Sequence, residues 1–372
     1  MRGPMPSPLS RRTLATCVLG IAVIAFALTQ KPASLDDFRP FYRAGNLLGS
    51  PDLFAQTRFH AGGLMFLRTP FYAALLHPLS ALPYPLARGI WVALMAFGFA
   101  GFVLLWPGDR SRIASAACWS VPVLMALAMG QDIALMLLIA AVSLHFWQGG
   151  RPVAAGLAAS LLALKVTLLV PVAIVFLARS RRGLLALLAG CAAQFTACFA
   201  IQGPHWISQY LAAIRSGILD QVPARMPCFA AFTSGWPLII LAAALYAWIW
   251  WIARRHSPAI AMTAALPLGL IAAPHGYAYD MAAAIPLLAA TANLRTASGF
   301  LTAFALSPAP YFLMSGDHPT HAGAALLIAA VLLAAARLPQ IPDATMARTD
   351  GSECPNSASW FPRWTSARTS LP

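Results

Sequence analysis

Two adjacent carboxylates, Asp36 and Asp37, stand out in a chain that has only 11 acidic residues. They follow the apolar run 14–29 and precede two arginines, Arg39 and Arg43, which alternate with aromatic residues. A positioned carboxylate can take the proton of a hydroxyl group that attacks an electrophilic carbon, and arginine binds phosphate oxygens bidentately. The pattern indicates either a general base beside a site for a phosphate-bearing substrate or a solvated turn at a membrane surface.

A lysine inside an apolar segment is the second candidate. Lys165 is one of only two lysines and lies in the middle of the apolar segment 152–178. An ionisable group at membrane depth is costly unless it is paired or hydrated, so its presence indicates a function. A phosphate oxygen would suit this point charge. The alternatives are snorkelling to the membrane surface or pairing with Asp132.

Polar residues between two later apolar runs form the third candidate, the segment Pro-His-Gly-Tyr-Ala-Tyr-Asp at 274–280. His275 could bind or protonate a leaving phosphate, and Asp280 could orient the imidazole. A polar turn with a structural histidine would look the same.

The segment Gly130-Gln131-Asp132 opens another apolar run. Backbone amides at a helix N-terminus favour an anion, but alone this is a weak signal, and capping of the helix by Asp132 is the favoured explanation. The spacing of Asp132, His275 and Asp280 is not that of zinc ligands. We therefore predict no metal and no cofactor.

Composition defines the elements that must position these residues. Hydrophobic residues make up 59% of the 372 residues and charged residues 10%, against about 45–50% and 25% in soluble domains. Apolar runs long enough to cross a bilayer recur along the chain, near 14–29, 86–106, 113–129, 131–147, 183–202, 232–252, 257–273, 276–292, 298–314 and 321–337. The sequence predicts an all-α, polytopic integral membrane protein with about 10–12 transmembrane helices.

The net charge of +14 reports topology rather than a nucleic-acid partner, because the arginines lie mostly in short loops between apolar runs. Every short loop that carries arginines becomes cytoplasmic if 64–82 is a re-entrant hairpin kinked at His77-Pro78 and Leu82-Pro83. The same pattern requires 152–178 to be two half-helices with Lys165 near their tip. The alternative for 152–178 is one long span of about 40 Å.

This topology gives three parts. Residues 1–13 form a cytoplasmic N-terminus, 14–337 a transmembrane domain, and 338–372 a disordered cytoplasmic tail that we expect to be dispensable. The outer face then collects the candidate residues together with Asp317-His318. The protein is expected in a bacterial-type inner membrane.

Five motifs occur in a fixed order along the chain, at 37–44, 69–83, 130–132, 155–165 and 274–280. Their residues and order resemble glycosyltransferase family 87, the polyprenyl-phosphate-sugar-dependent enzymes of the GT-C superfamily. The resemblance covers about 14–337. The chain departs from the family pattern in the residues after Gly130-Gln131 and after Lys165, so the sugar and acceptor are expected to differ from those of the mannoside enzymes.

The resemblance implies an inverting, metal-independent hexosyltransferase, mannosyltransferase-like, with a polyprenyl-phosphate sugar as donor, a lipid or glycan as acceptor, membrane lipid around it and no nucleic acid. It implies that Asp37 on the first outer loop is the catalytic base, with Asp36 as the second choice. The residues that it implies for the donor phosphate and the substrate are Lys165, His275, Arg39, Arg43, Gln131, Tyr279 and Asp280. Two other classes stay open at this point: a secondary transporter and a non-catalytic protein that binds a lipid-linked sugar.

Overall fold

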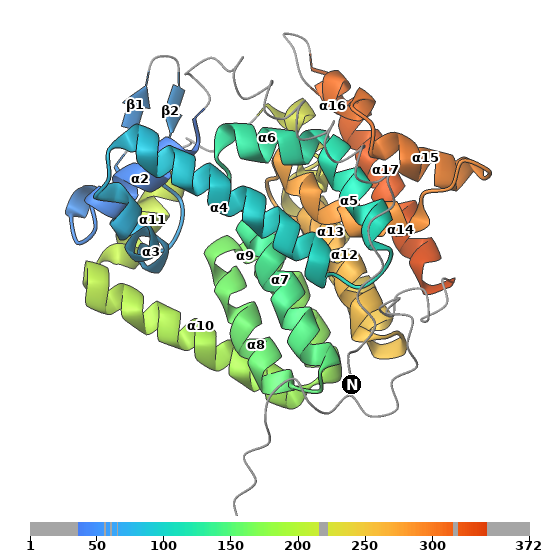
Figure 1. Cartoon of the computed structure of the whole chain (residues 1–372), viewed down its shortest axis with the longest axis horizontal. Helices are drawn as coiled ribbons and strands as arrows, with labels where there is room; N and C mark the ends of the chain where they lie inside the picture. The colour runs from blue at the N-terminus through green and yellow to red at the C-terminus, as the bar shows by residue number, and fades with distance from the viewer. Residues whose placement is uncertain are drawn as a thin grey trace, which may run out of the picture.

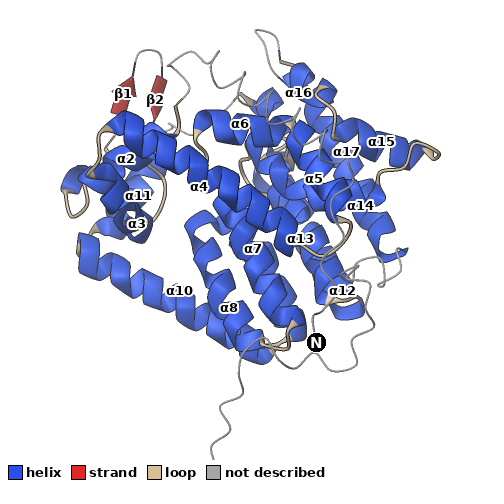
Figure 2. Ribbon diagram, viewed as in Figure 1, coloured by secondary structure: helices blue, strands red, loops and turns tan. Residues whose placement is uncertain are grey.

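The computed structural model describes residues 36–55, 57–59, 62–64, 66–215, 222–314 and 319–340. This part of the chain is almost entirely helical (Figure 2), and its sheet is an antiparallel pair of short strands, β1 (Thr57–Phe59) and β2 (Gly62–Leu64). The predicted all-α class is confirmed. The expected first span 14–29, Asp317-His318 and the tail beyond Gln340 lie outside the described residues.

Long apolar helices identify a multi-pass membrane protein. Five continuous helical segments are long and apolar enough to cross a bilayer. They are α4 (Tyr84–Leu105), the segment Pro152–Arg179, α10 (Arg181–Gln202), α12 (Gly235–Arg255) and α17 (His321–Arg337), which the short helix η6 (Leu338–Gln340) extends. Helix α12 exposes large apolar side chains such as Trp236 and Ile240, as expected of a surface that faces lipid.

Other apolar runs are broken or short, which explains why fewer helices pass this test than the 10–12 expected. Helices α5 (Arg110–Trp119) and α6 (Val121–Met129) are bent by 60° at Ser120 and count as one broken span or a re-entrant loop. The remaining runs form α7 (Ile133–Gln148), α13 (Pro258–Ala272), η5 (Ala278–Ala284) with α14 (Ile285–Thr291), and α15 (Ala297–Ala305) with α16 (Ala309–Met314).

The core lies around α13. Every residue from Ala259 to Ala272 is buried, so this helix is apolar on all sides and is enclosed by its neighbours. It packs against α12 and α9 (Val166–Arg179) and also touches α7. A 15-residue helix of this kind spans only about 22 Å, and it carries the polar loop 274–280 at its end.

The segment 152–178 folds back on itself at Lys165. It consists of α8 (Pro152–Ser160), the short helix η2 (Leu161–Lys165) and α9, and Lys165 has a non-helical backbone with φ −141° and ψ 87°. One straight helix of 28 residues would separate its ends by about 42 Å.

Packing shows instead that the two ends of the segment are adjacent. Gly183, just after α9, approaches Pro152 and Gly156 at the start of α8. Gly190 on α10 approaches Ser160, so α10 runs parallel to α8. Helix α9, which connects them along the chain, must therefore run in the opposite direction. The predicted half-helix pair with Lys165 at its tip is thus present, although the segment has the length and composition of a single span.

The segment 64–82 differs from the hairpin predicted for it. Residues 70–80 form one short helix, α3 (Pro70–Ser80), which continues through Pro78. Proline is tolerated here because it removes one hydrogen bond near the end of a short helix. Helix α3 packs mainly on α2 (Phe38–Asn46) and also on α10. A helix of 11 residues is about 16 Å long, too short to cross a bilayer. The number of membrane crossings before the later loops is therefore the same as with the predicted hairpin.

Aromatic contacts join the elements around α2. Phe41 on α2 contacts Phe66, Tyr72 and Trp91. Phe54 on the short helix η1 (Pro51–Phe54) contacts Tyr210 on α11 (Trp206–Arg215). These contacts form a layer at the end of the bundle where α2, α3 and α11 lie together at the left of Figure 1. The short helices η3 (Pro223–Arg225) and η4 (Phe229–Ala231) follow in the next loop.

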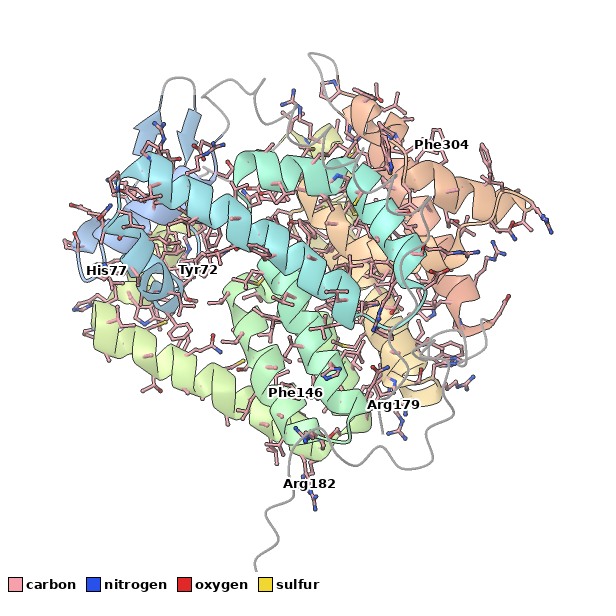
Figure 3. All side chains as sticks on the ribbon, viewed as in Figure 1. Tyr72, His77, Phe146, Arg179, Arg182 and Phe304 are labelled. Carbon is pink, nitrogen blue, oxygen red and sulfur yellow. The ribbon has the colours of Figure 1, made fainter. Side chains whose placement is uncertain are left out.

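Arg179 and Arg182, at the loop between α9 and α10, lie at another end of the bundle. Trp147 near the end of α7 stacks on Phe176 of α9 with ring centroids 4.2 Å apart, and the Arg179 side chain donates to the Ala253 carbonyl oxygen of α12. Figure 3 shows Phe146, Arg179 and Arg182 together at the lower end, remote from His77 and Tyr72.

Candidate active site

The start of α2 is docked on the turn between α6 and α7. The Asp37 N–H donates to the Met129 carbonyl oxygen over 2.8 Å. Gly130 in this turn has φ +73°, and a Cβ there would lie 2.8 Å from the Phe38 Cβ. The Trp91 indole donates to the Gly130 carbonyl oxygen over 2.8 Å. Only glycine allows this left-handed backbone and the close approach of Phe38.

Asp37 is oriented by a side-chain amide. Its Oδ2 accepts a hydrogen bond of 2.6 Å from Gln131 Nε2, and Gln131 is buried. The Asp37 side chain makes no capping hydrogen bond to α2. A half-buried carboxylate that accepts a hydrogen bond from a neighbouring side-chain amide has a defined direction, which suits a base.

Asp36 points to a different helix. Its Oδ2 accepts from the Tyr84 hydroxyl and lies 3.1 Å from Arg88 Nε. The Arg88 contact is an ion pair rather than an aligned hydrogen bond, because Nε has no hydrogen-bond partner among the described residues. Both partners are on the first turns of α4, so Asp36 ties α2 to α4 while Asp37 faces Gln131.

The first arginine of α2, Arg39, lies on the side of Asp36. The Arg39 guanidinium lies 5.3 Å from the centroid of the Tyr84 ring, a distance within the range of a cation–π interaction. Arg43 lies one helical turn beyond Arg39. The structure therefore brings Arg39 to the Tyr84–Asp36 pair.

Four charged side chains from different parts of the chain form a network, which we call the charged quartet: Arg68, Asp132, Lys165 and Asp280. The last three are buried, and Arg68 is partly buried. Lys165 Nζ contacts Asp280 Oδ1 and lies 4.0 Å from Asp132 Oδ1. Arg68 binds Asp132 through Nε at 3.1 Å and Nη2 at 3.3 Å. Two cations and two anions balance, which is the condition under which buried charges are tolerated.

Asp132 does not have the capping role that the sequence suggested. Its side chain makes no hydrogen bond to the first turn of α7 and is fully buried against Arg68 and Lys165. The Asp132 carboxylate thus pairs with the Arg68 guanidinium through two contacts instead of capping α7. The pairing of Lys165 with Asp132 that the sequence left open is present, and Asp280 is a closer second partner.

Asp280 likewise does not orient His275 as suggested. Its two oxygens contact Lys165 and the Tyr277 backbone N–H, the latter over 3.4 Å. Among the described hydrogen bonds of Asp280, none goes to His275. The carboxylate instead fixes the loop that begins η5 and holds Lys165 at the tip of the half-helices.

Aromatic rings cover the quartet on the side of His275. Tyr277 and Tyr279 stack with centroids 4.9 Å apart, Lys165 Nζ lies 5.6 Å from the Tyr279 centroid, and His275 lies edge-on to Tyr277 at 6.2 Å. Burial lowers the pKa of His275; Asp280 opposes that shift, and Lys165 and Arg68 add to it. The imidazole is therefore neutral near pH 7 and can donate or accept one hydrogen bond.

Arg68 is the residue that the sequence analysis missed. It lies in the apolar segment 64–82, and the argument that singled out Lys165, an ionisable group within an apolar run, applies to it equally. Tyr84 and Arg88 were missed because nothing in the sequence of α4 relates them to Asp36.

The structure thus brings together Asp37, Gln131 and the quartet, with His275 and Tyr279 beside it. A base, two cations and a neutral imidazole at one end of a helical bundle can deprotonate a hydroxyl group and hold an anion. A sequence model described as glycosyltransferase family 87 matches residues 66–274, more than half of the chain. No curated protein matches the chain.

Proposed function

The chain belongs to glycosyltransferase family 87, and from this membership we propose that it moves a hexosyl group from a polyprenyl-phosphate sugar to a hydroxyl group of a lipid or glycan acceptor. Family membership and the apolar helices identify a membrane glycosyltransferase. The donor, a mannose-like sugar and the inverting course are parts of the proposal.

Asp37 is the proposed catalytic base. The acceptor oxygen forms a bond to the anomeric carbon as the bond from that carbon to the phosphate oxygen breaks. The acceptor proton passes to Asp37, and the bonding electron pair leaves on the phosphate. One observation carries this assignment: of the two adjacent carboxylates, Asp36 is taken up by Tyr84 and Arg88, while Asp37 is aimed by the Gln131 amide.

Arg68 and Lys165 are proposed to hold the donor phosphate. Both cations are already held in place by Asp132 and Asp280, so they are preorganised for a phosphate oxygen. His275 would donate a hydrogen bond to the same phosphate from the adjacent loop. Arg39 and Arg43 would attract the anionic donor from the first turns after Asp37.

The site is proposed to face the extracytoplasmic side of a bacterial-type inner membrane, with both termini in the cytoplasm. The folded-back α8–α9 pair supports this topology because it returns the chain to the side on which it started. Arg151, Arg179, Arg181 and Arg182 then share a side, as the positive-inside rule requires. The quartet lies at the tip of that pair, on the opposite side.

Purified variants reconstituted in proteoliposomes with a polyprenyl-phosphate mannose and a lipid extract test the proposal. Asp37→Asn is expected to lower the rate of sugar transfer by about 10²–10⁴-fold with little change in donor affinity, because a base acts mainly in the transition state. Lys165→Ala should weaken donor binding instead. Asp52→Asn, which changes an exposed carboxylate on η1, is the control and should keep the wild-type rate.

Transfer at the wild-type rate by both Asp36→Asn and Asp37→Asn would remove the catalytic assignment. Passive binding of a lipid-linked sugar or transport would then describe the protein better.

A further inference from the structure

A second cluster of arginines lines a cavity far from Asp37. Arg112 at the start of α5, Arg295 after α14 and Arg337 at the end of α17 border a cavity of about 640 Å³. Asp36 binds the first turns of α4, whereas Arg112 follows the other end of this helix. Because α4 has 22 residues, about 33 Å separate the two ends.

The cluster carries excess positive charge. The described ion pair within it joins Arg112 Nε to Asp109 Oδ2 at 3.4 Å, and both side chains are exposed. Arg337 Nη1 donates to the hydroxyl oxygens of Ser298 at 2.8 Å and Thr296 at 3.3 Å. These neutral partners fix the guanidinium without neutralising it. Arginines that converge on one cavity with a single carboxylate among their described partners favour an anionic ligand.

An apolar cavity of about 350 Å³ adjoins the arginine cavity. The two share Arg112 and Ala292, so they meet at these residues beside α5 and α14, which are neighbours in Figure 1. We call the two adjoining cavities together the groove. Small and apolar side chains dominate the second part, notably Ala116, Ala289 and Leu306. Leu294, with 76% of its surface exposed, borders the arginine part.

We propose that this groove binds one anionic phospholipid of the membrane leaflet on the side of the basic loops. The headgroup phosphate would lie among Arg112, Arg295 and Arg337, and one acyl chain would lie along Ala116 and Leu306. Basic pockets between membrane helices at this boundary match phosphate headgroups in charge and depth. A soluble phosphate would use the arginines but would gain nothing from the apolar part, which is why a lipid is favoured.

Native mass spectrometry of the full chain in detergent tests the proposal, with phosphatidylglycerol as the anionic lipid and phosphatidylcholine as the neutral one. The wild type should retain one phosphatidylglycerol in preference to phosphatidylcholine. The double variant Arg112→Gln with Arg295→Gln should weaken this binding by about tenfold or more. Each basic residue near a lipid surface raises the binding affinity by a factor of somewhat less than about ten, and the variant removes two of them. Arg254→Gln with Arg255→Gln, at the end of α12, is the matched charge control and should bind normally.

Two further measurements keep the outcome decisive. Ala116→Phe fills the apolar part without changing charge and should also weaken lipid binding, and the melting temperature of each variant without lipid shows whether it is folded. Equal stabilisation of the wild type by glycerol 3-phosphate or inorganic phosphate would overturn the lipid assignment in favour of a soluble anion. Equal losses in the two arginine pairs would show a diffuse charge effect and would also overturn it.

Discussion

Gln131 Nε2 donates to Asp37 Oδ2 over 2.6 Å, and this contact joins the proposed base to the turn that also holds the charged quartet. Three consecutive residues of this turn have separate tasks. Gly130 packs closely against Phe38 and accepts the Trp91 hydrogen bond through its carbonyl oxygen. The Gln131 side chain donates a hydrogen bond to Asp37, and the Asp132 carboxylate binds Arg68. A shift of this turn would therefore displace the base and the phosphate cations together.

Gln131 is predicted to be a positioning residue. Gln131→Leu should lower the rate of sugar transfer by about tenfold or more, because the Asp37 carboxylate loses the donor that fixes its direction. Gln131→Glu places a second carboxylate beside Asp37, and two close carboxylates do not both ionise readily. Its rate profile should fall off at a higher pH on the acid side. An unchanged pH profile for Gln131→Glu, with normal membrane levels, would contradict this role.

The charge balance of the quartet is predicted to control stability. Arg68→Met leaves Asp132 with Lys165 as its shared cation, and breaking a buried pair typically costs about 3–5 kcal/mol. The double variant Arg68→Met with Asp132→Leu should recover part of this loss because it removes both charges. Denaturant unfolding of the detergent-solubilised protein measures the difference. Purely additive losses would show that the pair is not coupled in the folded state.

Glycine at 156 is predicted to be essential for the folded-back arrangement. A Cβ on Gly156 would lie 2.0 Å from the Gly183 carbonyl oxygen, which is backbone and cannot move aside. Gly156→Ala should therefore lower the melting temperature and the yield of folded protein. Gly89→Ala on α4 is the control, since a Cβ there meets nothing within 4 Å. Equal melting temperatures for the two variants would contradict the close packing of α8 on α10.

The two sides of the membrane are predicted to differ in reactivity. In a background without native cysteines, Arg151→Cys should react with an impermeant thiol reagent only from the cytoplasmic side, and His205→Cys and Pro274→Cys only from the outer side. All three positions are at least partly exposed: 151 precedes α8, 205 follows α10 and 274 follows α13. Labelling of position 151 from outside in intact cells would rule out the proposed topology.

His275 gives a prediction for the pH dependence of stability. Because burial lowers its pKa in the folded state, the unfolded chain binds the proton more readily. Stability is therefore fully present above the unfolded value of about 6.5 and declines as the pH falls below it towards the folded pKa. The variant His275→Gln should lose less stability than the wild type between pH 7 and pH 5, as thermal unfolding would show. Parallel curves for the two proteins would contradict the burial of a neutral imidazole.

The fold class could be predicted from the sequence, and so could the fact that segments far apart in the chain lie together at one site. The positions of the arginines alone predicted that Asp37, Gln131, Lys165 and Asp280 share a side, and these residues are now seen in one connected group. The half-helix pair was predicted for the same reason, because loop charge limits the number of crossings.

Side-chain partners could not be predicted in the same way. Asp132 was expected to cap a helix, and only the folded structure shows Arg68 beside it. The roles of Asp36 and Asp37 could not be separated, since adjacent residues share every local signal and differ only in which helix each side chain meets. The hairpin predicted for 64–82 was wrong at Pro78, where packing on α2 keeps α3 continuous. The break predicted at Leu82-Pro83 is present, between α3 and α4.

The folded-back pair also bears on how the chain enters the membrane during synthesis. An apolar stretch of 28 residues would normally be inserted as a spanning helix, yet arginines flank it at both ends and one lysine occupies its centre. Translocating either end would carry arginines across the bilayer against the usual bias. The segment must therefore turn back inside the membrane instead of crossing it. Asp132 precedes the segment in the chain and is available as a partner when Lys165 is made, whereas the second partner, Asp280, follows α12 and α13 and is made only after them.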